Sequence, residues 1–258
     1  MFTTHSVDLR NEKRLSNCNF SHLIKNVPPK CVARVTCLCL QGTAVEAAVV
    51  QDAICRFKNI EQLELGELQV SESVIHCASG NLKKLKDLRL IKTEYINLHT
   101  IKIIARYLPN LECLHLPFSA NVDDRVLKII ATRIRGLKRF SMRGCKHVTD
   151  EGLRLMLKCS GLQYIDVSYT KTMSYPTCVC IGQKDIFINK IMAPNTNLME
   201  SGLKLLKLRF EDRGLDPANC IVFQKQLLPY PGRRKLDFSM VFRRRATAFK
   251  ENSGNDKV

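Results

Sequence analysis

No stretch of the sequence approaches 18 consecutive apolar residues, and residues 1–15 lack the apolar segment that a secretory signal carries. We therefore expect neither a membrane-spanning helix nor a signal peptide. Glycine-rich phosphate loops, metal-ligand helices and convincing nucleophile–base spacings are also missing. These absences argue against an enzyme and predict no catalytic residue, no cofactor and no metal site.

Cysteine, by contrast, is frequent, with 12 copies in 258 residues. The cysteines are scattered along the chain between positions such as Cys37 and Cys159, a distribution unlike that of a disulfide framework. Because no secretory signal accompanies them, we expect reduced thiols and a cytoplasmic or nuclear location.

Positive charge exceeds negative charge, with 41 lysines and arginines against 24 aspartates and glutamates and a net charge of +17. A strongly basic surface suggests an acidic partner, although the same charge would also arise from solvated outer helices. Two basic clusters near the C-terminus are candidates for a nuclear-import signal or for contacts with acidic partners. They are Arg233, Arg234 and Lys235, and Arg243, Arg244 and Arg245.

One apolar pattern, L-x-x-L-x-L with conservative replacements, recurs six times. Its copies begin at Val35, Ile60, Leu85, Leu111, Leu137 and Leu162. The steps between them are 25 or 26 residues, and a fixed period with this internal spacing is typical of leucine-rich repeats. The sequence therefore predicts an α/β leucine-rich-repeat solenoid, with a curved parallel sheet inside and helices outside.

The repeats divide the chain into five predicted segments. Residues 1–31 are expected to form an N-terminal helical cap, and residues 32–170 to hold the six repeats. Because the period breaks after Val167, we predict an insertion over residues 171–196, a degenerate repeat with a C-terminal cap over residues 197–245, and a disordered tail over residues 246–258. Leu203–Leu208 fits both a strand and an amphipathic helix, and we slightly favour the strand.

The turn after each predicted strand also follows a pattern. The ninth position of each copy is a small hydroxyl or thiol residue in five of the six repeats. Such side chains can bond to backbone groups that lose their sheet partners where the strand ends. The exception is Leu68, where we expect an irregular repeat.

The segment from Leu137 to Cys159 carries the most specific motif. It contains Cys145, Thr149, Asp150 and Cys159 in the frame L-x-x-L-x-L-x-x-C-x-x-(I/V)-T-D-x-G-L-x-x-L-x-x-x-C. This resembles the cysteine-containing repeat of F-box/leucine-rich-repeat proteins, the substrate receptors of SCF ubiquitin ligases. The resemblance extends over roughly residues 32–170 and implies substrate recognition for ubiquitin-dependent degradation, with SCF components as partners.

Proteins of that family carry a helical F-box before their repeats. The segment before Val35 is short and mostly polar, and we recognise no F-box in it. Two alternatives therefore stay open: an interaction scaffold independent of ubiquitin, and a basic nuclear repeat protein associated with nucleic acid. We expect the chain to be a monomer by itself.

Side chains alternate between the two faces of a strand, so the third, fifth and seventh positions of each copy should face the concave surface. The predicted partner-binding residues there are Glu64, Asp87, Arg89, His115, Arg139, Arg143, Tyr164 and Asp166. Arginine and tyrosine are frequent interface anchors, which favours another protein as the partner. Interspersed carboxylates and few aromatic residues disfavour a nucleic-acid groove.

The cysteines of this surface do not predict a zinc site. Cys37 and Cys39 share one expected strand, whereas Cys113 and His115 belong to a strand three steps away. Three strand spacings amount to about 14 Å, which is too far for one zinc ion.

Overall fold

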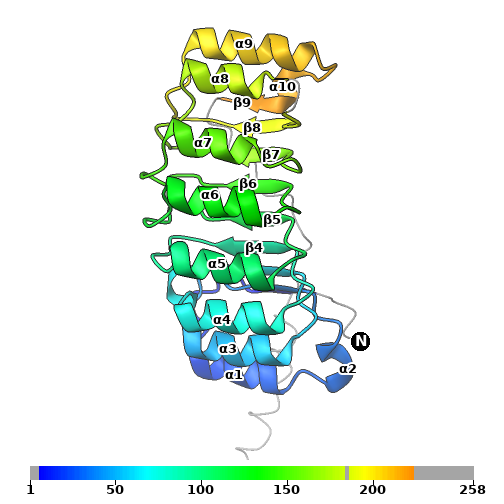
Figure 1. Cartoon of the computed structure of the whole chain (residues 1–258). Helices are drawn as coiled ribbons and strands as arrows, with labels where there is room; N and C mark the ends of the chain where they lie inside the picture. Colours follow the sequence, from blue (N-terminus) through cyan, green and yellow to red (C-terminus); the bar gives the residue numbers. More distant parts are fainter. Residues whose placement is uncertain (1–5, 184–185, 224–258) are drawn as a thin grey trace, which may run out of the picture.

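The computed structural model describes residues 6–183 and 186–223, which form one curved array of strands and helices (Figure 1). Nine strands make a single parallel sheet in which each strand pairs with the next one along the chain. They are β1 (Ser6–Asp8), β2 (Cys37–Cys39), β3 (Gln62–Leu65), β4 (Asp87–Leu90), β5 (Cys113–His115), β6 (Arg139–Ser141), β7 (Tyr164–Asp166), β8 (Lys190–Met192) and β9 (Ile221–Val222).

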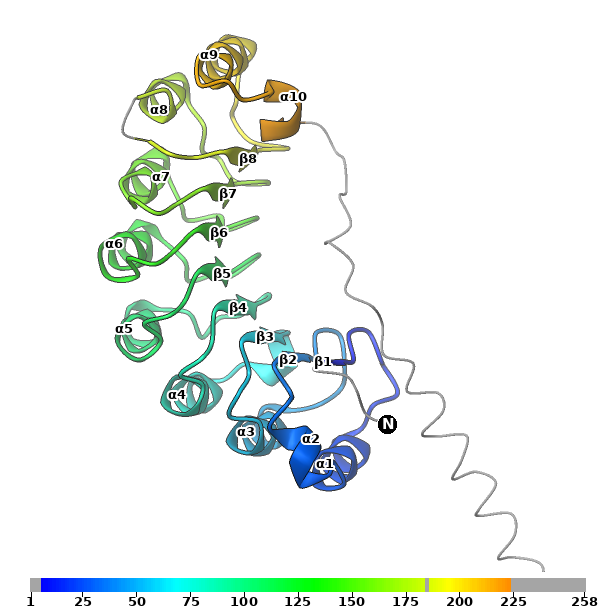
Figure 2. The same ribbon diagram turned by 90° about the vertical axis from the view of Figure 1, so that its right-hand side faces the viewer.

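Helices lie along the outer side of the arc and the sheet lines its inner side, as the sequence predicts (Figure 2). The helices are α1 (Asn17–Lys25), α2 (Pro29–Val32), α3 (Ala47–Arg56), α4 (Glu72–Asn81), α5 (Leu98–Tyr107), α6 (Asp124–Arg133), α7 (Asp150–Leu157), α8 (Tyr175–Ile181), α9 (Glu200–Glu211) and α10 (Pro217–Cys220), with a 3-10 turn η1 (Glu67–Gln69). The side chains of Asn97, Asp123 and Thr149 cap the starts of α5, α6 and α7. None of the described helices is long and apolar enough to cross a membrane.

The apolar repeat positions form the core between sheet and helices. Leu88, Leu114 and Phe140 lie side by side on β4, β5 and β6 in matched register, and all three are buried. Helix residues such as Ile104 and Ile130 close this core from the outside. Each repeat therefore buries its apolar face only against its neighbours, as expected for a solenoid.

In most repeats the chain continues its hydrogen-bond ladder past the strand end through one left-handed residue. The amide of Phe118 donates to the carbonyl of Arg143 (2.7 Å), and that of Tyr169 to the carbonyl of Pro194 (2.9 Å). The same position is occupied by Gly144, whose φ is 67°. One residue later, the hydroxyls of Thr43 and Thr170 donate to backbone carbonyls of their own turns at 2.8 and 2.6 Å, as expected for small polar residues there, whereas the buried Ser119 hydroxyl makes no such bond.

The repeat that contains Leu68 is irregular, as expected. Its turn is the 3-10 segment η1, and Leu68 itself is 61% exposed. The buried side chain of Gln69 takes over the missing local bonds, since it accepts from the amide of Gly66 (2.8 Å) and donates to the carbonyls of Thr43 and Val45. An amide side chain thus replaces the small hydroxyl of the other turns.

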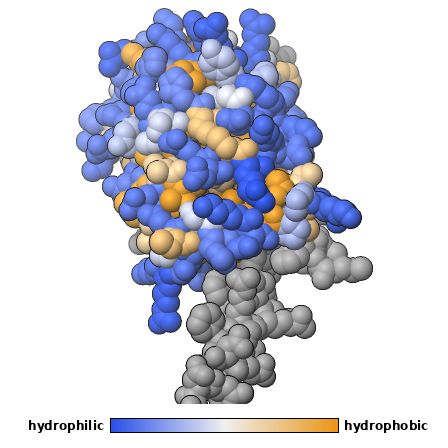
Figure 3. Space-filling view, turned by 90° about the horizontal axis from the view of Figure 1, so that it is seen from below, coloured by the Kyte–Doolittle hydropathy of each residue, from blue (hydrophilic) through white to orange (hydrophobic). Residues whose placement is uncertain are grey.

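The N-terminal segment contains a strand that the sequence did not reveal. Helix α1 buries Phe20 and Ile24, but the segment before it also supplies β1, which pairs in parallel with β2. Only Val7 and Leu9 of the usual three apolar positions are present there, so the pattern was too short to recognise. The end of the array that carries α1 and α2 is mainly hydrophilic, with scattered hydrophobic residues (Figure 3).

The predicted insertion over residues 171–196 is wrong, because this segment continues the array. Helix α8 belongs to it, and β8 pairs with β7 in the register of the other repeats. The favoured strand at Leu203–Leu208 is also wrong: these residues lie in helix α9, where Leu206 is buried and Leu208 faces solvent. The next repeat begins at Ile188, 26 residues after Leu162, so the period does not break.

Candidate partner-binding surface

Four of the eight residues predicted for the concave face are buried. Glu64, Asp87, His115 and Asp166 are each less than a tenth exposed, although they lie on the inner side of the strands. Asp166 accepts bonds from the hydroxyls of Ser141 (3.2 Å) and Ser168 (2.5 Å). A partner would therefore contact few of these carboxylates directly.

An inner charge network, formed by Asp8, Arg10, Glu64, Asp87 and Arg89, spans the first four strands. Asp8 holds Arg10 through two hydrogen bonds of 2.9 and 2.6 Å, and Asp87 holds Arg89 in the same way at 3.0 and 2.7 Å. Both guanidinium groups also approach Glu64, at 3.8 and 3.7 Å. Burial raises the pKa of Glu64, and the two arginines oppose that rise. The network thus links side chains of β1, β3 and β4 across the inner side of the sheet.

His115 lies next to the network in an environment that disfavours its charged form. Burial is the main cause that lowers its pKa to about 4; the cations Arg89 and Arg139 act in the same direction, and Asp87 opposes them. The imidazole is therefore neutral at physiological pH. A neutral buried ring suits a packing role better than an acid–base role.

The solvent-facing part of the concave surface lies over β6 and β7. Arg139 is exposed, and its Nε lies 3.0 Å from the sulfur of Cys113 on the neighbouring strand. Tyr164, which pairs in register with Arg139, is half-buried. Of the predicted residues, Arg139, Arg143 and Tyr164 are thus the ones most open to a partner.

An aromatic rim, formed by Phe118, Arg143 and Tyr169, borders this surface where the strands end. The Arg143 guanidinium carbon lies 4.8 Å from the ring centre of Tyr169 and 5.8 Å from that of Phe118. The two rings are 44% and 38% exposed, and their centres are 6.4 Å apart. Phe118 rests on Gly144, where a Cβ atom would collide with its ring. Strand alternation predicts Arg143 but neither aromatic residue, because both rings follow the strands.

Both rim aromatics adopt a backbone conformation that costs energy. Phe118 and Tyr169 have φ angles of 58° and 60°, in the left-handed region. A bulky residue in this region is a genuine outlier, strained by about 1–2 kcal/mol relative to glycine, which occupies the equivalent position at Gly144. Lys92 and Asn195 adopt the same conformation at the equivalent position of other repeats, so it belongs to the repeat turn, and at Phe118 and Tyr169 it leaves the rings partly exposed.

Further apolar side chains extend the rim along the same edge of the sheet. Leu68 and Tyr95, which follow β3 and β4, are both exposed. Aromatic residues and arginine are enriched at protein interfaces, whereas lysine and glutamate are depleted. The edge from Leu68 to Tyr169 carries such exposed aromatic and apolar side chains, interspersed with charged residues such as Lys92 and Glu94.

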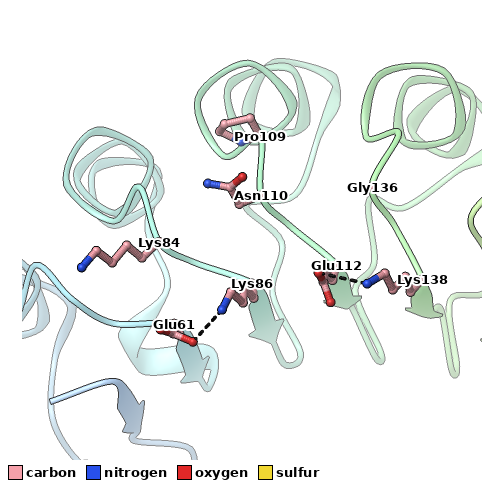
Figure 4. A pocket seen from close by; sticks show the side chains of 8 residues that line it. All are labelled: Glu61, Lys84, Lys86, Pro109, Asn110, Glu112, Gly136 and Lys138. Carbon is pink, nitrogen blue, oxygen red and sulfur yellow. Dashed lines mark hydrogen bonds and ion pairs between the residues drawn. The ribbon is translucent and has the colours of Figure 1, made fainter. Parts of the chain in front are cut away.

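The opposite edge of the sheet contains a shallow hollow of different character (Figure 4). Its charged side chains pair across adjacent strands: Lys86 with Glu61 at 3.0 Å, and Lys138 with Glu112 at 3.1 Å. The pairs are exposed, so each contributes at most about 1 kcal/mol. The rim, with its aromatic residues, is the stronger candidate for a binding surface.

The cysteines of the sequence motif have structural positions. Cys145 is fully buried and its thiol lies 3.2 Å from the carbonyl oxygen of Leu116 in the preceding repeat, while Cys159 is buried at the end of α7. Burial raises the pKa of Cys145 to about 12, so the thiol is protonated at neutral pH. None of the twelve cysteines, all of which lie in the described part of the chain, forms a disulfide.

The Thr-Asp-x-Gly part of the motif links successive repeats. Asp124 of α6 accepts from the amide and hydroxyl of Thr149, at 2.9 and 2.6 Å, and so fixes the start of α7. Asp150 does the same for α8, where it accepts from the amides of Met173 and Ser174. The bonds of Asp124 require Gly152, because any Cβ atom at that position would overlap the carboxylate.

Replacement of Gly152 by alanine should therefore destabilise the array by about 1.5 kcal/mol, since the new methyl group displaces Asp124 from Thr149. Gly80→Ala is the matched control: that glycine lies in α4 with open space around it, and alanine there should stabilise by about 0.5–1 kcal/mol. Chemical denaturation of both variants measures the difference. Equal effects of the two substitutions would contradict the assigned contact.

The two C-terminal basic clusters, Arg233, Arg234 and Lys235, and Arg243, Arg244 and Arg245, lie outside the described residues, and so does the segment predicted as a disordered tail. The nuclear-import hypothesis stays a prediction.

Comparison with known proteins identifies the class of fold. No family model matches the chain. An internalin (inlF) of Listeria monocytogenes superposes with a TM-score of 0.50 at 14% identity, over 80% of this chain and 58% of that one. Yeast Rad7, in a complex with Elc1, gives a TM-score of 0.59 at 12% identity, over 88% of this chain and 66% of that one. Together with the nine parallel strands, these likenesses establish a leucine-rich-repeat solenoid.

One curated relative is similar in sequence. Lysine-specific demethylase 2A of Xenopus tropicalis is 30% identical over 107 residues, which are 40% of this chain. The match covers 9% of the length of that protein, so this chain corresponds to a small part of it.

Proposed function

We propose that the chain is a protein-binding leucine-rich-repeat module that selects substrates for SCF-type ubiquitin-dependent degradation. The aromatic rim, with the exposed Arg139 and the half-buried Tyr164 on the adjoining strands, supports protein binding. Rad7, a structural neighbour, was crystallised with a protein partner, which fits this use of the fold. The ubiquitin-linked role is supported by the cysteine-containing repeat between Leu137 and Cys159.

The partner should offer carboxylates together with apolar side chains. Arg143 presents a cation between two exposed rings, and Arg139 at the start of β6 adds a second cation on the same concave side. The carboxylates of the inner charge network are engaged by Arg10 and Arg89, so they do not cancel this positive charge at the rim. An arginine stacked on aromatic rings is pre-ordered for bidentate binding of a carboxylate.

Capture from cells with blocked proteasomes tests the proposal. The wild-type chain should recover SCF components together with a ubiquitin-modified protein. Arg143→Ala should reduce recovery of the ubiquitin-modified protein about tenfold or more, which is the effect of a hot-spot residue. The free energy of unfolding should change by less than about 1 kcal/mol. Arg125→Ala is the matched control, because this exposed arginine lies on the outer helix α6.

Two results of the capture experiment would contradict the proposal. A partner that depends on Arg143 but comes without SCF components would support the ubiquitin-independent scaffold. Recovery that is equal for wild type and Arg143→Ala would show that the aromatic rim is not the binding surface.

A further inference from the structure

A group of two histidines and one glutamate converges on the helical side of the array. Glu72 and His76 are one turn apart on α4, and His99 lies in the first turn of α5. Within the described residues, these three form the group of histidine, cysteine or carboxylate side chains whose ligand atoms all lie within 4.8 Å of one another. We propose that Glu72, His76 and His99 form a Zn²⁺-binding site that joins α4 to α5.

The distances between the ligand atoms approach those of a zinc site. The Nε2 atom of His99 lies 3.4 Å from Oε1 of Glu72, and Nε2 of His76 lies 3.9 Å from the same oxygen. Ligand atoms at 2.0–2.2 Å from a tetrahedral zinc ion are about 3.4 Å apart. Small side-chain rotations are therefore enough to place a zinc ion between the three atoms.

The backbone holds all three residues in place. Residues four apart on a helix share one face, so Glu72 and His76 point the same way. The amide of His99 donates to the capping side chain of Asn97 at 2.8 Å, which fixes the first turn of α5. The hydroxyl of Ser71 caps α4 in the same manner by accepting from the amide of Val74.

The donor set selects the kind of metal. Two imidazole nitrogens and one carboxylate oxygen suit Zn²⁺, whereas Mg²⁺ and Ca²⁺ prefer oxygen ligands alone. All three side chains are exposed, so the ion would keep an open fourth position for water or for a ligand from another molecule. The neighbouring thiol of Cys77 is not among the ligand atoms that converge there.

Titration of the full chain with Zn²⁺ under reducing conditions tests the site. We expect one ion per chain from the site and an increase in Tm on binding, because Zn²⁺ stabilises the folded state that holds the three ligands together. His99→Gln should weaken binding tenfold or more and remove the Tm increase. His22→Gln, which changes an exposed histidine on α1, is the matched control and should bind as the wild type does.

Two results would overturn the proposal. One is zinc affinity that survives both His99→Gln and Glu72→Gln. The other is loss of zinc affinity in the Cys55→Ser variant. The sulfur of Cys55 lies 3.7 Å from that of Cys77, so such a loss would assign the ion to the thiol pair. Co²⁺ in place of Zn²⁺ gives an independent reading, since thiolate ligation adds an absorption band that a His-His-Glu site lacks.

Discussion

Leu114→Ala should lower the free energy of unfolding by about 2–5 kcal/mol. Leu114 lies at the centre of the array on β5, is fully buried, and stands between Leu88 and Phe140 of the adjacent strands. Truncation removes its apolar contacts and leaves a cavity that neighbouring strands cannot fill, because their own register holds them in place. Since each repeat is stable only through its neighbours, a defect in the middle weakens both halves.

Leu68→Ala provides the matched control for this prediction. It makes the same chemical change at a side chain that is 61% exposed, and should alter stability by less than about 0.5 kcal/mol. Urea denaturation followed by circular dichroism measures both variants. A loss at Leu114 no greater than the loss at Leu68 would show that the central core is not packed as described.

The repeat frame was predictable from sequence where three apolar residues stand at the right spacing. At β8 the third apolar position is Ala193, a small residue, so the pattern was weak there. By spacing alone, Leu203–Leu208 matched the strand pattern better than the segment around β8 did. However, the chain there also places Leu206 and Phe210 on one face of a helix. Tertiary packing decided between the two, and short apolar runs cannot be resolved by periodicity.

The residues of the candidate site were predictable only in part. Strand alternation located the concave columns, but it treated every polar side chain there as accessible. In the structure Arg10, which lies before the first recognised repeat, reaches Glu64 and helps to bury it. The rim aromatics Phe118 and Tyr169 belong to turns, and Glu72 and His99 approach only because adjacent helices pack. Contacts between repeats were the missing information in each case.

The protein should lose stability as the pH falls, and His115 should carry about 2 kcal/mol of the loss between pH 7 and pH 5. In the folded chain, burial and then Arg89 lower the pKa of His115 to about 4, compared with about 6.5 in the unfolded chain. As the pH falls, His115 therefore binds a proton in the unfolded chain before it does so in the folded chain. The stability that neutral His115 provides is fully present above about pH 6.5 and is lost as the pH falls toward 4.

His115→Gln tests this assignment, because glutamine stays neutral across the whole range. The variant is expected to show a smaller difference in unfolding free energy between pH 7 and pH 5, by about 2 kcal/mol. Arg139→Gln should also reduce the difference in unfolding free energy between pH 7 and pH 5, but only slightly. Arg139 is a minor cause of the lowered pKa of His115, and burial is the main one. If His115→Gln loses stability as steeply as the wild type, the acid sensitivity must come from other groups, and the environment of His115 must be more open than its burial indicates.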